Sequence, residues 1–294
     1  MKNIVFLFSS NKYDATIPEE AYKKEYKYVV ANNYETILLN IEKLKQKGKI
    51  MIPKSKTKKW IIYRGGELKK SEYLDLYQSL AEANYIMINT PEEYSNITFI
   101  SNWYEKISDI TPQVYFTDLE LDKGEIIYYL SLFPKSIIIK DYVKSRKFEW
   151  KEACYIEDVN NTRKAMEVIN NFITREGENL IGGLVMREFV ELKQLGIDEK
   201  TDKPISEEYR IFIYNKQVIT AIDYAKGKEV KDTTAFDSVI DTCISRLDAS
   251  FYTVDIAKTK EGKYIVIEVG DGQSSSLKGL NEEIFYNYFL NLIK

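Results

Sequence analysis

The chain has 294 residues and contains no histidine. Without imidazole there can be no Ser-His-Asp or Cys-His nucleophile pair, no HExxH zinc site and no histidine proton relay. Any chemistry must therefore use carboxylates, lysine, arginine or a bound cofactor. The two cysteines, Cys154 and Cys243, are too few for a disulfide framework or a four-ligand metal cluster. We interpret them as buried, reduced thiols, which favours a cytoplasmic protein.

Long apolar runs and an excess of basic charge are also missing. The run Ile4–Phe8 is shorter than a signal-peptide core, and no apolar run approaches 18 residues, so neither export nor a membrane span is predicted. Lysine and arginine number 42 against 45 acidic residues. The 23 tyrosines are scattered rather than interleaved with basic residues, so a nucleic-acid platform is not expected. Few glycines and prolines indicate a compact protein of two domains or three small lobes.

Short apolar runs alternate with amphipathic stretches, which is typical of an α/β or α+β protein. In the first lobe we expect strands at 4–8, 34–39, 60–63 and 85–89 and helices at 18–30, 70–83 and 91–106. A small open sheet of this kind binds ligands at the carboxyl ends of its strands. In the rest of the chain we expect strands at 136–142, 153–156 and 183–190, helices at 161–176 and 236–247, a hairpin across 207–224, and a terminal helix capped by Asn281.

The last predicted hairpin carries two carboxylates. Its strands flank a turn centred on Glu261 and Gly262, and residues equally far from that turn face each other, which sets Asp255 opposite Glu268. Each carboxylate interrupts an apolar strand, and like charges directly opposite on a sheet repel. A divalent cation between them resolves the repulsion, because Mg²⁺ is typically held by one or two carboxylates plus substrate phosphates. The alternatives are carboxylates that point to solvent, or one that pairs with a lysine.

Two further segments suggest a nucleotide. Lys140 ends the apolar strand that begins near Ser136, and Lys144 follows four residues later, where a lysine is well placed to meet a phosphate. The alternative is an ordinary surface lysine whose stem covers apolar residues. The segment 182–190 reads as a strand with charged residues in its middle, which could offer backbone groups to an adenine edge, although a plain edge strand would look similar.

The order of these parts resembles the ATP-grasp superfamily, the ATP-dependent carboxylate–amine ligases and their relatives. Lys140 matches the family's apolar-apolar-Lys strand end, and 185–190 matches its aliphatic hinge followed by Glu-Phe-Val. Asp255 and Glu268 match its late motif of an Asp on one strand and Glu-x-Asn on the next. Glycine stands at the usual asparagine position, Gly270, so that Asp271 or Gln273 would have to substitute as the ligand.

The first lobe resembles a phage and bacterial ATP-grasp clade with an N-terminal Arg-Gly motif, whose members are inferred to be peptide or amino-acid ligases. The matching residues are Arg64-Gly65, Asn89-Thr90-Pro91, Glu208-Tyr209-Arg210 and Gly270-Asp271-Gly272-Gln273. The resemblance implies an ATP-grasp fold with antiparallel sheets behind a βα-layered lobe. Its lobes would be a pre-ATP-grasp lobe at 1–110, a small lid lobe at 111–190 and a C-terminal lobe with the metal site at 191–294.

The resemblance also implies chemistry and roles. The protein would be an ATP- and Mg²⁺-dependent ligase that joins a carboxylate to an amine of an amino acid, peptide or protein through an acyl phosphate. The implied metal ligands are Asp255, Glu268 and Asp271; the implied phosphate contacts are Lys140 and Lys144; and the implied nucleotide border is Met186, Arg187, Glu188, Phe189, Val190 and Glu208. Arg210 would hold a phosphate or the acyl phosphate oxygens, unless it pairs with Glu208 or Asp223. Arg64 would hold the substrate carboxylate, unless it forms a helix-capping or interlobe salt bridge.

Two other functions remain open. The same framework supports a kinase that phosphorylates a hydroxyl, and Gly270 is compatible with a nucleotide-binding regulatory module of reduced activity. The expected partners are ATP and the two substrates, with no nucleic acid and no membrane, and a homodimer is left open as the assembly.

Overall fold

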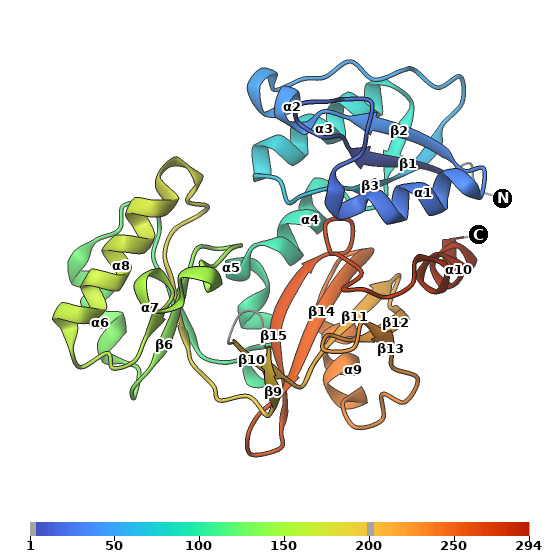
Figure 1. Ribbon diagram of the computed structural model, residues 1–294. Coiled ribbons are helices and arrows are strands. Elements are labelled where there is room, and N and C mark those ends of the chain that lie inside the picture. The colour runs from blue at the N-terminus through green and yellow to red at the C-terminus, as the bar shows by residue number, and fades with distance from the viewer. Residues whose placement is uncertain (1–3, 199–202, 294) are drawn as a thin grey trace. The chain divides into compact units, whose positions relative to one another are not determined.

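The computed structural model describes residues 4–198 and 203–293, whose contacts divide into two compact units (Figure 1). Unit 1 comprises Met1–Ile97, Glu207–Ile256 and Glu268–Lys294, and unit 2 comprises Thr98–Ser206 and Ala257–Ile267. Most of the first and third predicted lobes therefore fall into one unit, and the finer division into three lobes remains a prediction. In the described ranges no helix is both long and apolar enough to cross a bilayer.

The first sheet of unit 1 is parallel, with strand order β2-β1-β3-β4. Its strands are β1 (Ile4–Ser9), β2 (Glu35–Leu39), β3 (Lys59–Arg64) and β4 (Tyr85–Met87), and its helices are η1 (Glu20–Tyr22), α1 (Lys23–Ala31), α2 (Ile41–Lys47), α3 (Lys70–Glu82) and α4 (Pro91–Thr98). A parallel strand covered on both faces reads as a continuous apolar run, and Val5 to Phe8 are fully buried. The predicted strands are confirmed. Helix α2 was not predicted, because Ile41 and Leu44 alone mark its buried face.

The second sheet of unit 1 has the order β13-β12-β11-β14-β15, and the ends of β14 and β15 next to their turn, within Ala257–Ile267, belong to unit 2. Its strands are β11 (Glu208–Tyr214), β12 (Gln217–Asp223), β13 (Lys228–Glu229), β14 (Phe251–Lys258) and β15 (Tyr264–Asp271), and its helices are α9 (Asp237–Arg246) and α10 (Glu282–Ile293). The predicted hairpin is confirmed as β11–β12, whose turn residues Asn215 and Lys216 both have positive φ, as a two-residue hairpin turn requires. Asn281 accepts a hydrogen bond from the Glu283 amide and caps α10 as predicted.

Helix α10 joins the two sheets of unit 1 into one core. The ring of Tyr286 lies 5.4 Å from that of Phe6 on β1, while the ring of Phe285 lies 4.9 Å from that of Phe212 on β11. Such edge-to-face pairs add about 0.5–1.5 kcal/mol each beyond their buried area. The parallel sheet and the antiparallel sheet are thus held in a fixed relation by aromatic packing.

Unit 2 is built on an antiparallel sheet with the order β5-β8-β6-β7. Its strands are β5 (Val114–Phe116), β6 (Ile137–Lys140), β7 (Tyr155–Ile156) and β8 (Val185–Glu188), beside a separate pair, β9 (Gln194–Asp198) and β10 (Lys203–Ser206). Its helices are α5 (Ile100–Trp103), η2 (Tyr104–Lys106), η3 (Ser108–Ile110), α6 (Lys123–Ser131), η4 (Lys147–Glu149), α7 (Trp150–Ala153), α8 (Thr162–Glu176) and η5 (Gly177–Asn179). The helix predicted at 91–106 is interrupted, because Phe99 has an extended backbone.

Helices α6 and α8 cover one face of this sheet. Ile137 and Ile139 of β6 and Met186 of β8 are fully buried among the apolar residues of these helices. Because side chains alternate along a strand, Lys140 and Arg187 lie on the opposite face. The sheet thereby separates an apolar face, which holds the core, from a face that carries cationic side chains.

Candidate functional site

A buried ion pair lies at the centre of the second sheet of unit 1. Arg210 on β11 donates from Nε to Asp255 Oδ1 at 2.8 Å and from Nη2 to Oδ2 at 2.7 Å. Arg210 is 8% exposed and Asp255 2%. The hydroxyl of Tyr224, directly after β12, donates to Asp255 Oδ2 and accepts from Arg210 Nη2 at 2.7 Å. The partner of Arg210 is therefore Asp255, and neither Glu208 nor Asp223.

Glu268 belongs to the same electrostatic cluster. Burial by itself would lower the pKa of Arg210, but the charge of Asp255, with a smaller contribution from Glu268, raises it above its ordinary range. Burial and the same two carboxylates raise the pKa of the Tyr224 hydroxyl. Tyr224 therefore stays protonated and donates to Asp255. Three groups of the resemblance, Arg210, Asp255 and Glu268, are thus brought together, and Tyr224 joins them although its sequence position gave no signal.

At the end of the hairpin far from the turn, the Gly272 amide donates to the Phe251 carbonyl at 3.2 Å, in the register that would set Asp255 opposite Glu268. Next to the turn, the Thr259 amide donates to the Lys263 carbonyl at 2.7 Å, which is one residue out of that register. The direct opposition of Asp255 and Glu268 therefore stays a prediction.

In unit 2, Lys140 and Lys144 frame a tight turn organised by Asp141. The Asp141 carboxylate accepts the amides of Val143 at 2.7 Å, of Lys144, and of Ile181 at 3.2 Å. Asp141 is fully buried, and burial raises the pKa of its carboxyl although these amides and Lys140 oppose the shift. Asp141 was not among the residues predicted from the sequence. The signal was available, because an Asp whose side chain binds the amide two residues on is a common turn device.

Two predicted nucleotide contacts on the hinge strand β8, Met186 and Arg187, lie on opposite faces of the sheet. Met186 lies fully buried on the helix-covered face, a position that does not suit a side-chain contact with a nucleotide. Arg187 donates from Nη2 to Thr111 Oγ1 at 2.9 Å and to the Val266 carbonyl at 3.0 Å, so its guanidinium anchors the start of β15.

Glu188, the last residue of the hinge strand, and the two residues after it have other surroundings. Glu188 accepts the Gln113 amide at 3.3 Å. The ring of Phe189 lies 4.9 Å from that of Tyr155, and Val190 is half-exposed. In unit 1, the Glu208 carbonyl accepts the Tyr224 amide at 3.0 Å.

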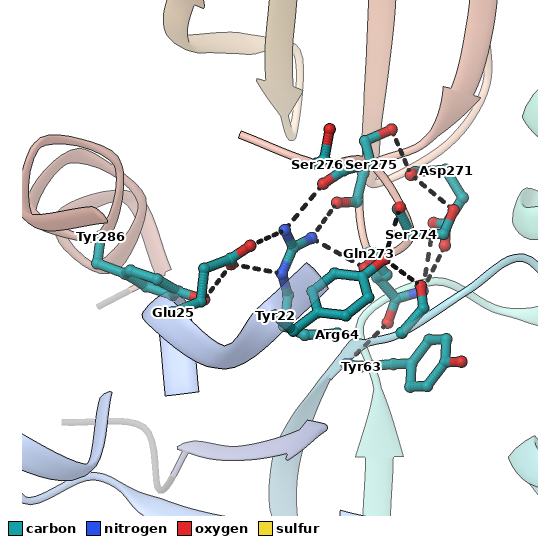
Figure 2. A network of polar contacts seen from close by, with 12 residues as sticks. Tyr22, Glu25, Tyr63, Arg64, Asp271, Gln273, Ser274, Ser275, Ser276 and Tyr286 are labelled. Atoms are coloured by element: carbon teal, nitrogen blue, oxygen red, sulfur yellow. Dashed lines mark hydrogen bonds and ion pairs between the residues drawn. The ribbon is translucent and has the colours of Figure 1, made fainter. Parts of the chain in front are cut away.

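Arg64 lies in a second buried network of unit 1, shown in Figure 2. Its Nε and Nη2 donate to Glu25 at 2.8 and 2.9 Å, and its remaining donors reach the carbonyls of Gly272, Gln273 and Ser275 at 2.7–2.8 Å. The side chain is 0% exposed, and all five guanidinium donors are used. This geometry does not fit the predicted role of binding a substrate carboxylate. The ion-pair partner is Glu25 on α1, within the predicted first lobe, so the salt bridge is neither the helix cap nor the interlobe bridge given as the alternative.

Asp271 and Gln273 complete this network. Asn89 donates to Asp271 Oδ1 at 2.6 Å and exchanges two hydrogen bonds with the Phe251 backbone at 2.7 and 2.8 Å. Gln273 donates to Tyr73 at 2.9 Å. Burial is the main reason that the pKa of Asp271 rises to about 7. A carboxyl that is 1% exposed, paired with an amide and hard to ionise is a poor choice for the predicted third metal ligand.

The same network fills the carboxyl end of the parallel sheet. The Tyr22 hydroxyl donates to the carbonyls of Gly65 and Ser274 at 2.6 and 2.9 Å, and Tyr63 donates to the Gly66 carbonyl. The segment 271–276 thus occupies the edge where open sheets of this kind usually bind ligands. The motif residues Arg64, Asn89, Asp271 and Gln273 are far apart in the sequence but lie in one hydrogen-bond network. That network binds the loop 271–276 of the chain itself. We call the hydrogen-bond network of Tyr22, Glu25, Tyr63, Arg64 and Asn89 with the segment 271–276 the buried lock.

The described residues contain no cluster of three or more acidic, cysteine or histidine side chains that could hold a metal by themselves. Any metal at Asp255 and Glu268 would therefore need further ligands from a substrate. Mg²⁺ is commonly bound in this way, by one or two carboxylates plus phosphates. Three of the roughly four lone-pair sites of Asp255 are used by Arg210 and Tyr224, which leaves about one on Oδ1.

Solved structures similar to this chain share one fold. The ATP-grasp ligase PsnB, complexed with a phosphomimetic variant of its minimal precursor, Mg and ADP, aligns with a TM-score of 0.58 at 12% identity, over 100% of this chain and 97% of its own. A RimK domain protein from Sphaerobacter thermophilus aligns at 0.60 and 12%, over 96% and 99%. D-alanyl-alanine synthetase A from Vibrio cholerae aligns at 0.61 and 12%, over 98% and 97%. The fold is therefore the ATP-grasp fold, as the resemblance implied.

The sequence itself gives the family. The model of the ATP-grasp domain, R2K clade family 3, matches residues 131–287, more than half of the chain. The chain belongs to this ATP-grasp family. A comparison with curated proteins finds no match.

Proposed function

We propose that the protein is an ATP- and Mg²⁺-dependent ligase that joins a carboxylate to an amine through an acyl phosphate. The observation that carries the proposal is the cluster of the buried Arg210 and Asp255 with the half-buried Glu268, which lies inside the segment matched by the ATP-grasp family model. Burying a carboxylate in an apolar strand, beside a second carboxylate, costs a large desolvation free energy. Binding of Mg²⁺ and phosphate is the function that explains this arrangement best.

In this proposal Asp255 and Glu268 hold Mg²⁺, whose role when bound is to neutralise charge on the phosphates. Lys140 and Lys144 contact the phosphates, and the Asp141 turn fixes the backbone on which both lysines stand. Arg210, fixed by Asp255 and Tyr224, stabilises the acyl phosphate oxygens. Glu188, Phe189, Val190 and Glu208 border the nucleotide.

The chemistry balances without an imidazole. A carboxylate oxygen attacks the γ-phosphorus of ATP, so that one O–P bond forms while the bond to ADP breaks. An amine then attacks the acyl carbon, the C–O bond breaks, and phosphate leaves with the oxygen that came from the carboxylate. The protein mainly positions the groups and neutralises charge.

The substrate class is a carboxylate and an amine carried by amino acids, peptides or proteins. Support comes from relatives of the same fold: PsnB is described with a precursor, and the Vibrio cholerae protein is described as a D-alanyl-alanine synthetase. We further propose that the protein acts in the cytoplasm, where ATP is available.

The test is product analysis after incubation of the protein with Mg-ATP and a pool of amino acids and short peptides. The proposal predicts ADP and phosphate whose formation depends on a carboxylate and an amine, with a new mass equal to their condensation product. Phosphate that stays on an acceptor would make the protein a kinase. ATP binding without turnover on any pool, including protein extracts, would favour a regulatory module.

A further inference from the structure

Unit 2 contains a cavity of about 290 Å³ beside its edge strand β5. Its walls come from η2, η3, β5 and α6, and include the rings of Tyr104, Tyr115 and Tyr129. A volume near 300 Å³ is at the small end of ligand pockets, and suits one long side chain or a small molecule better than a nucleotide.

The rings are fixed before any ligand arrives. Tyr115 and Tyr129 stack with centroids 5.2 Å apart, and their hydroxyls are engaged by Gln113 at 2.6 Å and Glu125 at 3.0 Å. The Tyr104 hydroxyl accepts the Val114 amide at 3.1 Å. A preformed pocket of this kind loses little side-chain entropy on binding.

The edge of β5 offers backbone groups next to the cavity. The amides of Glu188 and Thr117 bond to the carbonyls of Gln113 and Leu184, which fixes the alternation of hydrogen bonds between β5 and β8. By that alternation, the N–H and C=O of Phe116 point away from β8. Among the described residues, the Phe116 amide has no hydrogen-bond partner. An edge strand with such groups is a template for an added strand.

The charge of the cavity selects the side chain. Glu105, which is exposed, is one of the lining residues, and within the described ranges no lysine or arginine lines the cavity. The segment that follows β5 carries Asp118, Glu120 and Asp122, which are exposed. Aromatic faces attract a cation within about 6 Å, and a carboxylate adds to that attraction.

We propose that β5 binds an extended peptide segment that carries a lysine or arginine. The peptide pairs with the outward N–H and C=O of Phe116 as an added strand, and its cationic side chain enters the cavity among Tyr104, Tyr115 and Tyr129, opposite Glu105. In the sheet order, β8 lies between β5 and the strand of Lys140, so the site is separate from the phosphate contacts of the proposed function. The peptide-binding proposal is tested independently of the proposed ligase function, because peptide binding can be measured without ATP.

The experiment measures fluorescence anisotropy of a labelled peptide, Val-Thr-Val-Lys-Val-Thr-Val, against a control peptide with norleucine in place of lysine, at low salt and without nucleotide. The full chain should bind the lysine peptide about tenfold more tightly, as expected for a combined cation–π and ion-pair contribution. Glu105→Gln should weaken it about threefold, since the pair is partly solvated. Glu157→Gln, an exposed carboxylate after β7 at the other edge, is the matched control and should leave binding unchanged.

A second variant tests the backbone contact. Phe116→Pro removes the outward N–H without removing a ladder bond, which an edge strand tolerates. It should weaken both peptides by roughly threefold to tenfold, the value of one hydrogen bond, while the melting temperature confirms that the sheet still folds. The proposal is overturned if neither peptide binds, if both bind equally, or if Glu105→Gln and Glu157→Gln behave alike.

Discussion

Two buried arginines of unit 1 have different hydrogen-bond partners. Arg64 spends all its donors on Glu25 and on carbonyls of the 271–276 segment. Arg210 is held by a carboxylate that the proposed function assigns to a metal. A guanidinium presents five donors in a planar fork. Arg210 uses four of them, on Asp255, Tyr224 and the Ser276 carbonyl, which leaves one Nη1 donor for the contact that the proposed function gives it.

The first prediction concerns the pair of Arg64 and Glu25. Arg64→Met removes one partner and leaves the Glu25 carboxylate buried, which should cost about 3–5 kcal/mol in the free energy of unfolding. Urea denaturation measures the loss. The double variant Arg64→Met/Glu25→Gln should recover part of it, since no buried charge is then left. Wild-type stability of Arg64→Met, with a raised apparent KM for the carboxylate substrate, would instead restore the role predicted from sequence.

The second prediction concerns Asp271. Burial raises the pKa of its carboxyl from 3.8 to about 7, so between these values the folded protein holds a proton that the unfolded chain has released. This contribution to stability is full at low pH and is lost as the pH rises through about 7. Relative to Asp271→Asn, the wild type should lose on the order of 3 kcal/mol between pH 5 and pH 8. Denaturant unfolding of both proteins at the two pH values measures this, and parallel pH profiles would contradict it.

At the scale of elements, short segments link the networks. The 271–276 segment binds Arg64 through three carbonyls, and the next carbonyl along, that of Ser276, accepts from Arg210 at 3.2 Å. The buried lock is therefore connected to the Asp255 cluster through one stretch of backbone. A substitution in the buried lock is therefore expected to affect the proposed metal site, although the substituted residue does not contact that site.

The third prediction concerns the Asp141 turn. Asp141→Ala removes the carboxylate that accepts hydrogen bonds from three amides, which should loosen the backbone that carries Lys140 and Lys144 and weaken ATP binding about tenfold or more. Calorimetric titration with ATP gives the affinity. Asp158→Ala is the matched control, because Asp158 also accepts an amide in a turn of unit 2, and it should bind ATP normally. Equal effects of the two variants would show that Asp141 serves folding alone.

Elements were predictable where the local pattern is strong. Apolar runs such as Ile4–Phe8 and the amphipathic pattern of 161–176 gave strand β1 and helix α8 to within a residue or two. Helix α6 was not predicted, and the helix predicted at 91–106 is broken at Phe99. In such short segments tertiary packing decides the backbone, and local propensity is a weak guide.

At the scale of the whole molecule, the fold followed from the order of motifs, but the contacts of the motif residues did not. Asp255 and Arg210 were predicted as functional residues, yet their direct pairing was not. The contacts of Arg64 join residues 39 to 211 positions apart, and only the folded chain fixes them. A sequence shows which residue types recur in a family pattern, whereas burial decides whether such a residue faces a ligand or the interior.

The fourth prediction concerns the proposed metal site. Asp255→Asn combined with Glu268→Gln should reduce Mg-ATP turnover by at least about a hundredfold, because both carboxylates assigned to the metal lose their charge. The variant should still unfold cooperatively. Glu229→Gln, on the short strand β13 of the same sheet, is a control that should keep normal turnover. Normal turnover in the double variant would remove the metal assignment.

The central claim is that a carboxylate is activated by phosphorylation, and isotope transfer tests it most directly. The protein is incubated with Mg-ATP and a pool of amino acids and peptides whose carboxylates carry ¹⁸O, and the released phosphate is analysed by mass spectrometry. An acyl phosphate predicts one ¹⁸O in each phosphate released, formed together with ADP and an amide product. Phosphate that carries no ¹⁸O, although ADP and product accumulate, would contradict the account.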